Sequence, residues 1–174
     1  MKLFSTLPWA KITIALAIVL IMLGIGGISF VYHSDRRQAD SLSAYAHIDF
    51  RSAPNEKGIP ESATLTLVDY CYSSSQLSSK VTLLLDGIPW DISAITKHTP
   101  PTYSLREYNP DTSFKNTNKF FIEIPADAIP DIRTAERIRV RYSYENGRTI
   151  DLPLNDDDLA YWKEQVKLPP GTKK

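Results

Sequence analysis

Hydrophobic and polar residues follow two different patterns along the chain. From Ile12 to Tyr32, twenty-one consecutive residues carry no formal charge. An α-helix rises about 1.5 Å per residue, so this stretch matches the roughly 30 Å hydrocarbon layer of a bilayer. From about His47, short runs of β-branched, aromatic and aliphatic residues alternate with turn-forming clusters, which is typical of β-strands. The pattern predicts a membrane helix followed by a mostly-β domain.

The apolar stretch is predicted to be an uncleaved signal anchor that crosses the membrane once. Signal peptides have apolar stretches of roughly 7–15 residues that end at a cleavage site of the form small-x-small. This stretch is longer, and the nearest such site, Ala44-Tyr45-Ala46, lies well beyond it. The membrane is therefore one expected partner of the chain.

The orientation of this anchor depends on positive charge, which marks the cytoplasmic side. Lys2 and Lys11 precede the span, and Arg36 and Arg37 follow it, so the two sides are nearly balanced. We expect the short amino end to lie inside and the large domain outside, in the periplasm next to a bacterial inner membrane.

The chain divides into five expected segments. They are a short tail (1–11), the transmembrane helix (12–32), a polar juxtamembrane linker (33–46), a mostly-β globular domain (47–168) and a flexible tail (169–174). Within the domain we expect strands near 47–52, 63–72, 80–85, 88–93, 102–108, 119–125, 136–144 and 148–154, and a carboxy-terminal helix at about 156–167. The expected fold class is an antiparallel sandwich-like or small α+β domain with this carboxy-terminal α-helix.

One hairpin can be argued from the turn residues Asp86-Gly87, since both positions of such a turn need positive φ. A two-residue turn here places three apolar pairs on one face: Leu85 with Ile88, Leu83 with Trp90 and Val81 with Ile92. Pro89 then has no N–H on the side away from its partner strand, which predicts that strand 88–92 is an edge strand or is paired only poorly on its outer side.

A second hairpin lies at Asn146-Gly147, where the obvious two-residue turn would place apolar residues among arginines. A three-residue loop, 145–147, shifts the register by one residue. Tyr142 then faces Ile150 and Arg141 faces Asp151, a favourable cross-strand charge pair. We therefore predict the second register.

The densest acidic cluster, Asp156 to Asp158, is explained by the start of a helix. Asn155 is a preferred N-cap residue, and Asp158 three positions on completes a pattern like a capping box. The exposed N–H groups and dipole of a first turn favour negative charge. The helix is expected to dock through Leu159, Trp162 and Val166, which follow at helical spacing.

Composition excludes several classes of chemistry. The formal net charge is zero, so no nucleic-acid partner is expected. A single cysteine, Cys71, excludes an intramolecular disulfide, and it lies in a strand-like run rather than beside a base such as His47 or His98. The three histidines are too widely spaced for a zinc motif. We expect no catalytic residue, no metal site and no cofactor.

The chain is therefore predicted to be a non-catalytic interaction module, or a small subunit of an envelope membrane protein complex. The expected binding surface combines the strand at 88–92 with a long loop between 94 and 118 and with a stripe of arginines. Its candidate residues are Trp90, Tyr103, Tyr108, Phe114, Arg137 and Arg139. Homo-oligomerisation is left open.

Two other functions are kept as alternatives. An envelope hydrolase acting on cell-wall material would need paired carboxylates, for which Asp69, Asp86 and Asp91 are the candidates. A module that binds a glycan or an anionic polymer would use the alternating Arg137, Arg139 and Arg141, which project from one face of a strand.

Overall fold

The computed structural model of the chain describes residues 37–102, 109 and 114–170. The predicted transmembrane helix at 12–32 lies outside these residues. Among the helices that the structure does describe, none has the length and apolar character needed to cross a bilayer.

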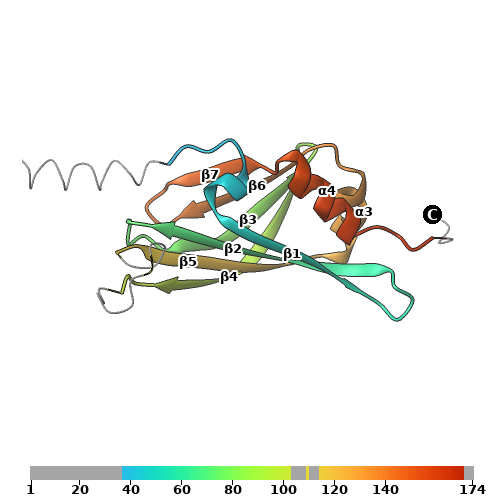
Figure 1. The fold of residues 1–174 in the computed structure, drawn as a ribbon, viewed down its shortest axis with the longest axis horizontal. Helices are drawn as coiled ribbons and strands as arrows, with labels where there is room; N and C mark the ends of the chain where they lie inside the picture. The colour runs from blue at the N-terminus through green and yellow to red at the C-terminus, as the bar shows by residue number, and fades with distance from the viewer. Residues whose placement is uncertain (1–36, 103–108, 110–113, 171–174) are drawn as a thin grey trace, which may run out of the picture. The chain divides into compact units, whose positions relative to one another are not determined.

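The described residues form a mostly-β domain with antiparallel strands and a carboxy-terminal helix (Figure 1). The strands are β1 (His47–Pro54), β2 (Pro60–Cys71), β3 (Leu77–Leu85), β4 (Ile88–Thr99), β5 (Asn116–Ile124), β6 (Ile138–Tyr144) and β7 (Thr149–Pro153). The helices are α2 (Leu42–Tyr45), the 3-10 turn η1 (Ala126–Ala128), α3 (Ile129–Thr134) and α4 (Asp156–Gln165).

The seven strands form one curled sheet in the order β1-β2-β5-β4-β3-β6-β7. Strand β4 changes partner halfway along its length. Ile88–Ser93 pairs with β3, and Ala94–Thr99 pairs with β5. A strand that switches partners in this way lets a sheet fold over on itself. We call β1, β2, β5 and Ala94–Thr99 half-sheet A, and Ile88–Ser93, β3, β6 and β7 half-sheet B.

Both predicted hairpin registers are confirmed. In the first hairpin, Leu83 pairs with Trp90, and Asp86 and Gly87 both have positive φ. In the second, Tyr142 pairs with Ile150. Both registers keep the apolar side chains of the paired strands on one face, and this face is buried or partly buried except at Ile88, which is 61% exposed.

The predicted long loop between 94 and 118 is wrong in its bounds. Strand β4 continues to Thr99, and β5 already begins at Asn116. The physical reason is that the run after Trp90 keeps alternating, with β-branched residues and no glycine or proline before Pro100. Of the strand predicted at 102–108, residues 103–108 lie outside the described residues.

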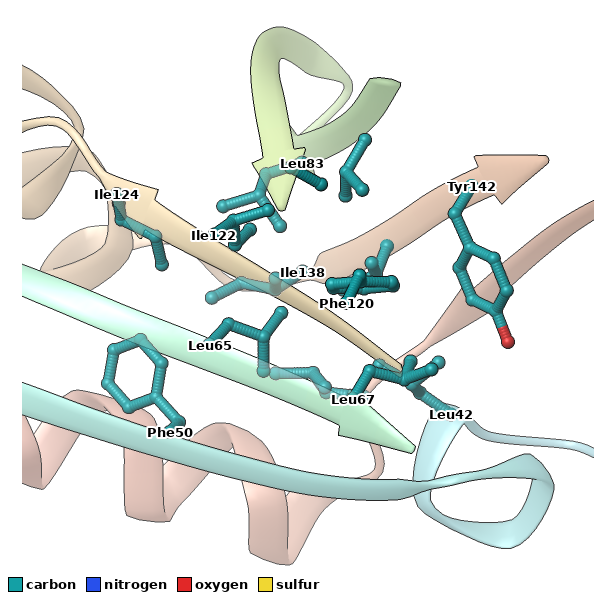
Figure 2. Packing of buried hydrophobic residues seen from close by; sticks show 14 of the residues in the cluster. Leu42, Phe50, Leu65, Leu67, Leu83, Phe120, Ile122, Ile124, Ile138 and Tyr142 are labelled. Carbon is teal, nitrogen blue, oxygen red and sulfur yellow. The ribbon is translucent and has the colours of Figure 1, made fainter. Parts of the chain in front are cut away.

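The core lies between the inner faces of the two half-sheets, and Figure 2 shows side chains from β1, β2, β3, β5 and β6 pointing toward one another. Leu65, Leu83 and Ile122 are fully buried there. Phe120 of half-sheet A meets Tyr142 of half-sheet B edge-on, with 5.4 Å between ring centroids. The two halves therefore share one hydrophobic core.

Helix α4 begins and docks as its sequence predicts. The side chain of Asn155 accepts a hydrogen bond from the Asp158 N–H at 2.7 Å, so the predicted N-cap is confirmed. Trp162 is buried and stacks on Phe50 of β1 with 4.1 Å between ring centroids. One carboxylate oxygen of Asp158 is buried without a hydrogen-bond partner among the described residues.

The short helix α2, within the segment predicted as a linker, packs onto the domain. Leu42, Tyr45 and Ala46 are all buried in the core cluster. Arg148, next to β7, donates a 2.8 Å hydrogen bond to the Tyr45 hydroxyl. These contacts place the start of the packed domain before β1.

Candidate interaction surface

Strand β4 has an unpaired side along each of its two parts. Ile88–Ser93 pairs only with β3, and Ala94–Thr99 pairs only with β5, among the strands that the structure describes. In Figure 1, β4 runs along the lower margin of the domain, next to β5. An unpaired side presents backbone N–H and C=O groups that another strand can bind.

Backbone alternation shows which groups face this open side. Leu85 and Ile88 flank a two-residue turn and therefore exchange hydrogen bonds with each other. Counting along β4 in steps of two, the residues that face β5 are then 95, 97 and 99. The backbone groups of Ala94, Thr96 and His98 face away from β5. We call this unpaired side of Ala94–Thr99 the free half-edge.

The first part of β4 is protected from strand addition. Pro89 lies opposite Leu84, in a pair whose backbone groups face away from β3, so this side lacks one N–H donor. Next along the strand, Asp91 binds Lys80 at 2.9 Å and accepts a hydrogen bond from Thr82. These contacts lower the pKa of Asp91, first through the Thr82 bond and then through Lys80. Proline and charge are common means of blocking an edge strand.

The free half-edge contains no proline, and its one formally charged side chain is Lys97; it also carries an exposed apolar side chain. Ile95 is 74% exposed and pairs with Phe121 of β5 on the outer face of half-sheet A. The next outward pair is Lys97 with Lys119, directly opposite each other. No ion pair joins either lysine to a carboxylate of the described residues. We call Lys97 and Lys119 the lysine pair.

The arginine stripe on the outer face of half-sheet B is mostly neutralised within the fold. Arg139 and Arg141 bind the two carboxylate oxygens of Asp151 at 2.9 Å and 2.6 Å. Burial alone would raise the pKa of Asp151, but the hydrogen bonds and charges of the two arginines outweigh it and hold the pKa below its ordinary value. Two of the three candidate arginines therefore form ion pairs with this one acid.

Arg137 lies apart from that network. It is exposed and lines a shallow depression of about 550 Å³ together with Asp86, Gly87, Glu136 and Arg139. Two of the five lining residues are acidic, so the depression does not offer an anion a uniformly positive surface.

The remaining predicted site residues do not gather into one described surface. Trp90 is half-buried against the core, and its Nε1 is buried without a hydrogen-bond partner among the described residues. Phe114 is 47% exposed and has a positive φ just before β5. Tyr103 and Tyr108 lie outside the described residues. Of the expected aromatic surface of loop and edge, the structure describes Trp90 and Phe114.

A buried polar cluster lies between the two half-sheets. The Tyr144 hydroxyl donates to the fully buried carboxylate of Asp69. Nearby, Asn118 donates to the Cys71 thiol at 3.1 Å, and its side-chain oxygen meets His98 Nδ1 at 2.9 Å. An amide between the thiol and the imidazole cannot relay a proton as a base. This arrangement does not activate Cys71 as a nucleophile.

The three carboxylates proposed for a hydrolase lie at three different places in the fold. Asp69 is buried in the core, and Asp91 lies on the outer face of half-sheet B. Asp86 accepts hydrogen bonds from the backbone N–H groups of Glu136 and Arg137. Within the described ranges, no three His, Cys, Asp or Glu residues are grouped so as to hold a metal ion.

The sequence-based prediction of the site did not include Ile95, Lys97 and Lys119. The alternation through "ISAITKHT" was the available sign that β4 continues beyond Ser93. The sequence does not indicate which strand pairs with this second part of β4, because no short turn joins β4 to β5 and sets their register.

Comparisons with known proteins identify no family for this chain. No protein-family model and no curated protein matches it. One solved structure that resembles it, described as a flagellar-like filament of Iho670, is 9% identical, with a TM-score of 0.37 over 83% of this chain and 98% of the other. A likeness this distant carries no argument about the function of this chain.

Proposed function

We propose that this chain is a membrane-anchored, non-catalytic interaction module of the cell envelope, or a small subunit of an envelope membrane complex. Its extracytoplasmic domain binds a protein segment by strand addition at the free half-edge, and residues 12–32 anchor it in the membrane. Main-chain hydrogen bonds give such binding its affinity, and alternate side chains give it specificity.

The free half-edge is the observation that supports this proposal. Proteins usually block an unpaired strand with proline, charge or a covering element. The fold does so along Ile88–Ser93, with Pro89 and the ion pair of Asp91, whereas along Ala94–Thr99 the described residues supply no proline and no second pairing strand, and the charge is that of Lys97 alone. An edge left open beside a 74% exposed Ile95 is well suited to bind another strand.

The proposal can be tested by photocrosslinking in living cells with two matched variants. A photoreactive amino acid at Ile95 should crosslink the full-length chain to a distinct protein, whereas one at exposed Glu145 of half-sheet B should not. Thr96→Pro removes an N–H that faces the free half-edge and should abolish the crosslink, while Thr96→Ala keeps that N–H and should preserve it. Equal crosslinking from both variants would contradict binding by strand addition.

The orientation is tested separately by a reporter fused after Lys174. An alkaline phosphatase, whose disulfides form only in an oxidising compartment, should be active if the domain lies outside the cytoplasm. An inactive phosphatase together with a fluorescent cytoplasmic reporter would place the domain on the other side.

A further inference from the structure

We propose that the free half-edge selects an extended acidic segment, with an apolar residue two positions from the acid. This inference rests on the proposed function, because it assumes that a strand is added at Ala94–Thr99. It concerns the chemistry of that strand, which is argued from Ile95, Lys97 and Lys119.

The lysine pair is the first reason for an acidic partner. Lys97 and Lys119 lie directly opposite each other on neighbouring strands. Like charges in this position destabilise a sheet. The described residues provide no carboxylate within ion-pair distance of either lysine, although the fold pairs Lys80 with Asp91 and Arg141 with Asp151 on the other half-sheet. Among the described residues, the lysine pair is therefore an uncompensated positive site.

Strand geometry determines where the acid of the partner must lie. Side chains of an added strand stand about 4.5–5.5 Å from those directly opposite, measured between Cβ atoms. A carboxylate opposite Lys97 lies beside the lysine pair, and it relieves the repulsion between the two charges. Lys97 is thus expected to set the register of the bound segment.

Ile95 determines the other specific position. It is two residues from Lys97, so both side chains project from the same outer face. An apolar residue opposite Ile95 covers the exposed side chain of Ile95, on the side away from Phe121. The expected motif on the outer face is an apolar residue, one intervening residue and an acid.

A second copy of this chain is disfavoured as the occupant, because its own edge would bring a further lysine to a site that already holds two. The described residues at Ala94–Thr99 contain no acid. Charge complementarity therefore favours a different protein segment.

The probe for this inference is a labelled ten-residue peptide in which Val and Glu alternate on one face and Thr fills the other. A matched peptide carries Gln in place of Glu. Fluorescence anisotropy with the full-length chain in non-ionic detergent should show binding of the glutamate peptide, weakened by salt. Lys97→Gln with Lys119→Gln should weaken the glutamate peptide roughly three- to tenfold and leave the glutamine peptide unchanged.

The outcomes separate this inference from the proposed function. If both peptides bind equally and Thr96→Pro abolishes both, the edge binds strands but the acidic selectivity is wrong. If neither peptide binds, both proposals are overturned. A dimer of the free chain that Thr96→Pro converts to a monomer would show that a second copy occupies the edge.

The stability of the unbound chain provides an independent check. Removing one charge of the lysine pair should raise the melting temperature by about 1–2 °C, since like-charge repulsion is relieved. A fall in the melting temperature of Lys97→Gln would show that an acid of the chain itself already pairs with the lysines, and it would overturn the inference.

Discussion

The two half-sheets differ in whether the positive charges on their outer faces are paired with acids. On half-sheet B, Asp151 holds Arg139 and Arg141, and Asp91 holds Lys80 beside the blocking Pro89. On half-sheet A, the lysine pair has no acid among the described residues, and the edge next to it is open. The difference shows that a basic stripe in the sequence is a poor sign of a binding site until the positions of the acids are known.

This comparison requires that both faces belong to one cooperative domain, and Trp162→Ala tests that requirement with the largest expected effect. The substitution removes the stack on Phe50 and leaves a cavity under α4. We expect a loss of about 3–5 kcal/mol in the free energy of unfolding, measured by denaturant titration of the full-length chain in detergent. Both half-sheets should unfold in one transition. Glu164→Ala, at an exposed position of the same helix, is the control, and two separate transitions would contradict a shared core.

The turn of half-sheet B provides a test of intermediate size. Asp86 accepts hydrogen bonds from the backbone of Glu136 and Arg137, at 2.7 to 3.1 Å, and has a φ of 50°. Asp86→Ala leaves those N–H groups without an acceptor and strains the turn, so we expect a loss of about 1–2 kcal/mol. Amide hydrogen exchange should accelerate at 136 and 137 but not along the free half-edge.

Asp86→Asn is the matched control for this turn, because asparagine keeps an acceptor and tolerates positive φ. It should lose clearly less stability than Asp86→Ala. Equal losses in the two variants would assign the effect to charge rather than to the turn.

The smallest effect on the free energy of unfolding is expected from removing the ion pairs on the outer face of half-sheet B. Asp151→Asn should cost about 1 kcal/mol or less at neutral pH, because the pairs are partly exposed. The pKa of Asp151 is lowered by folding, so its contribution is complete above the unfolded value of about 3.9 and is lost as the pH falls below it. Unfolding curves from pH 7 to pH 3 should therefore converge for the wild type and the variant.

Asp49→Asn provides the comparison on half-sheet A. Asp49 pairs with Arg51 there, and both side chains are more than half exposed, so no measurable change is expected. A larger loss from Asp49→Asn than from Asp151→Asn would contradict the ranking of the two faces.

Much of the local structure could be predicted from the sequence. The Asp86-Gly87 turn, the shifted register at Asn146 and the cap at Asn155 follow from neighbouring residues only, and all three are confirmed. Local rules work here because each partner lies within a few residues, so turn chemistry and face alternation determine the pairing.

The candidate site was predicted less well. Trp90 lies in the part of β4 that pairs with β3 alone, although β4 as a whole lies between β3 and β5 and is not an edge strand of the sheet, and the Trp90 side chain is half-buried against the core. Arg139 was correctly placed on a solvent-facing stripe, yet Asp151 engages it together with Arg141. The patterns indicated which face a side chain occupies but not whether another chain segment already binds it.

The sequence by itself determined the two hairpins, the start of the last helix and the alternation that gives each strand a buried face. Only the tertiary structure decided that β4 passes from β3 to β5, which opens the free half-edge and places Lys97 opposite Lys119. The same long-range packing brings the Tyr144 hydroxyl to Asp69 across the core. These contacts join residues far apart in the chain, and no local turn or period specifies such pairs, because they depend on how the whole sheet curls to bury its inner faces.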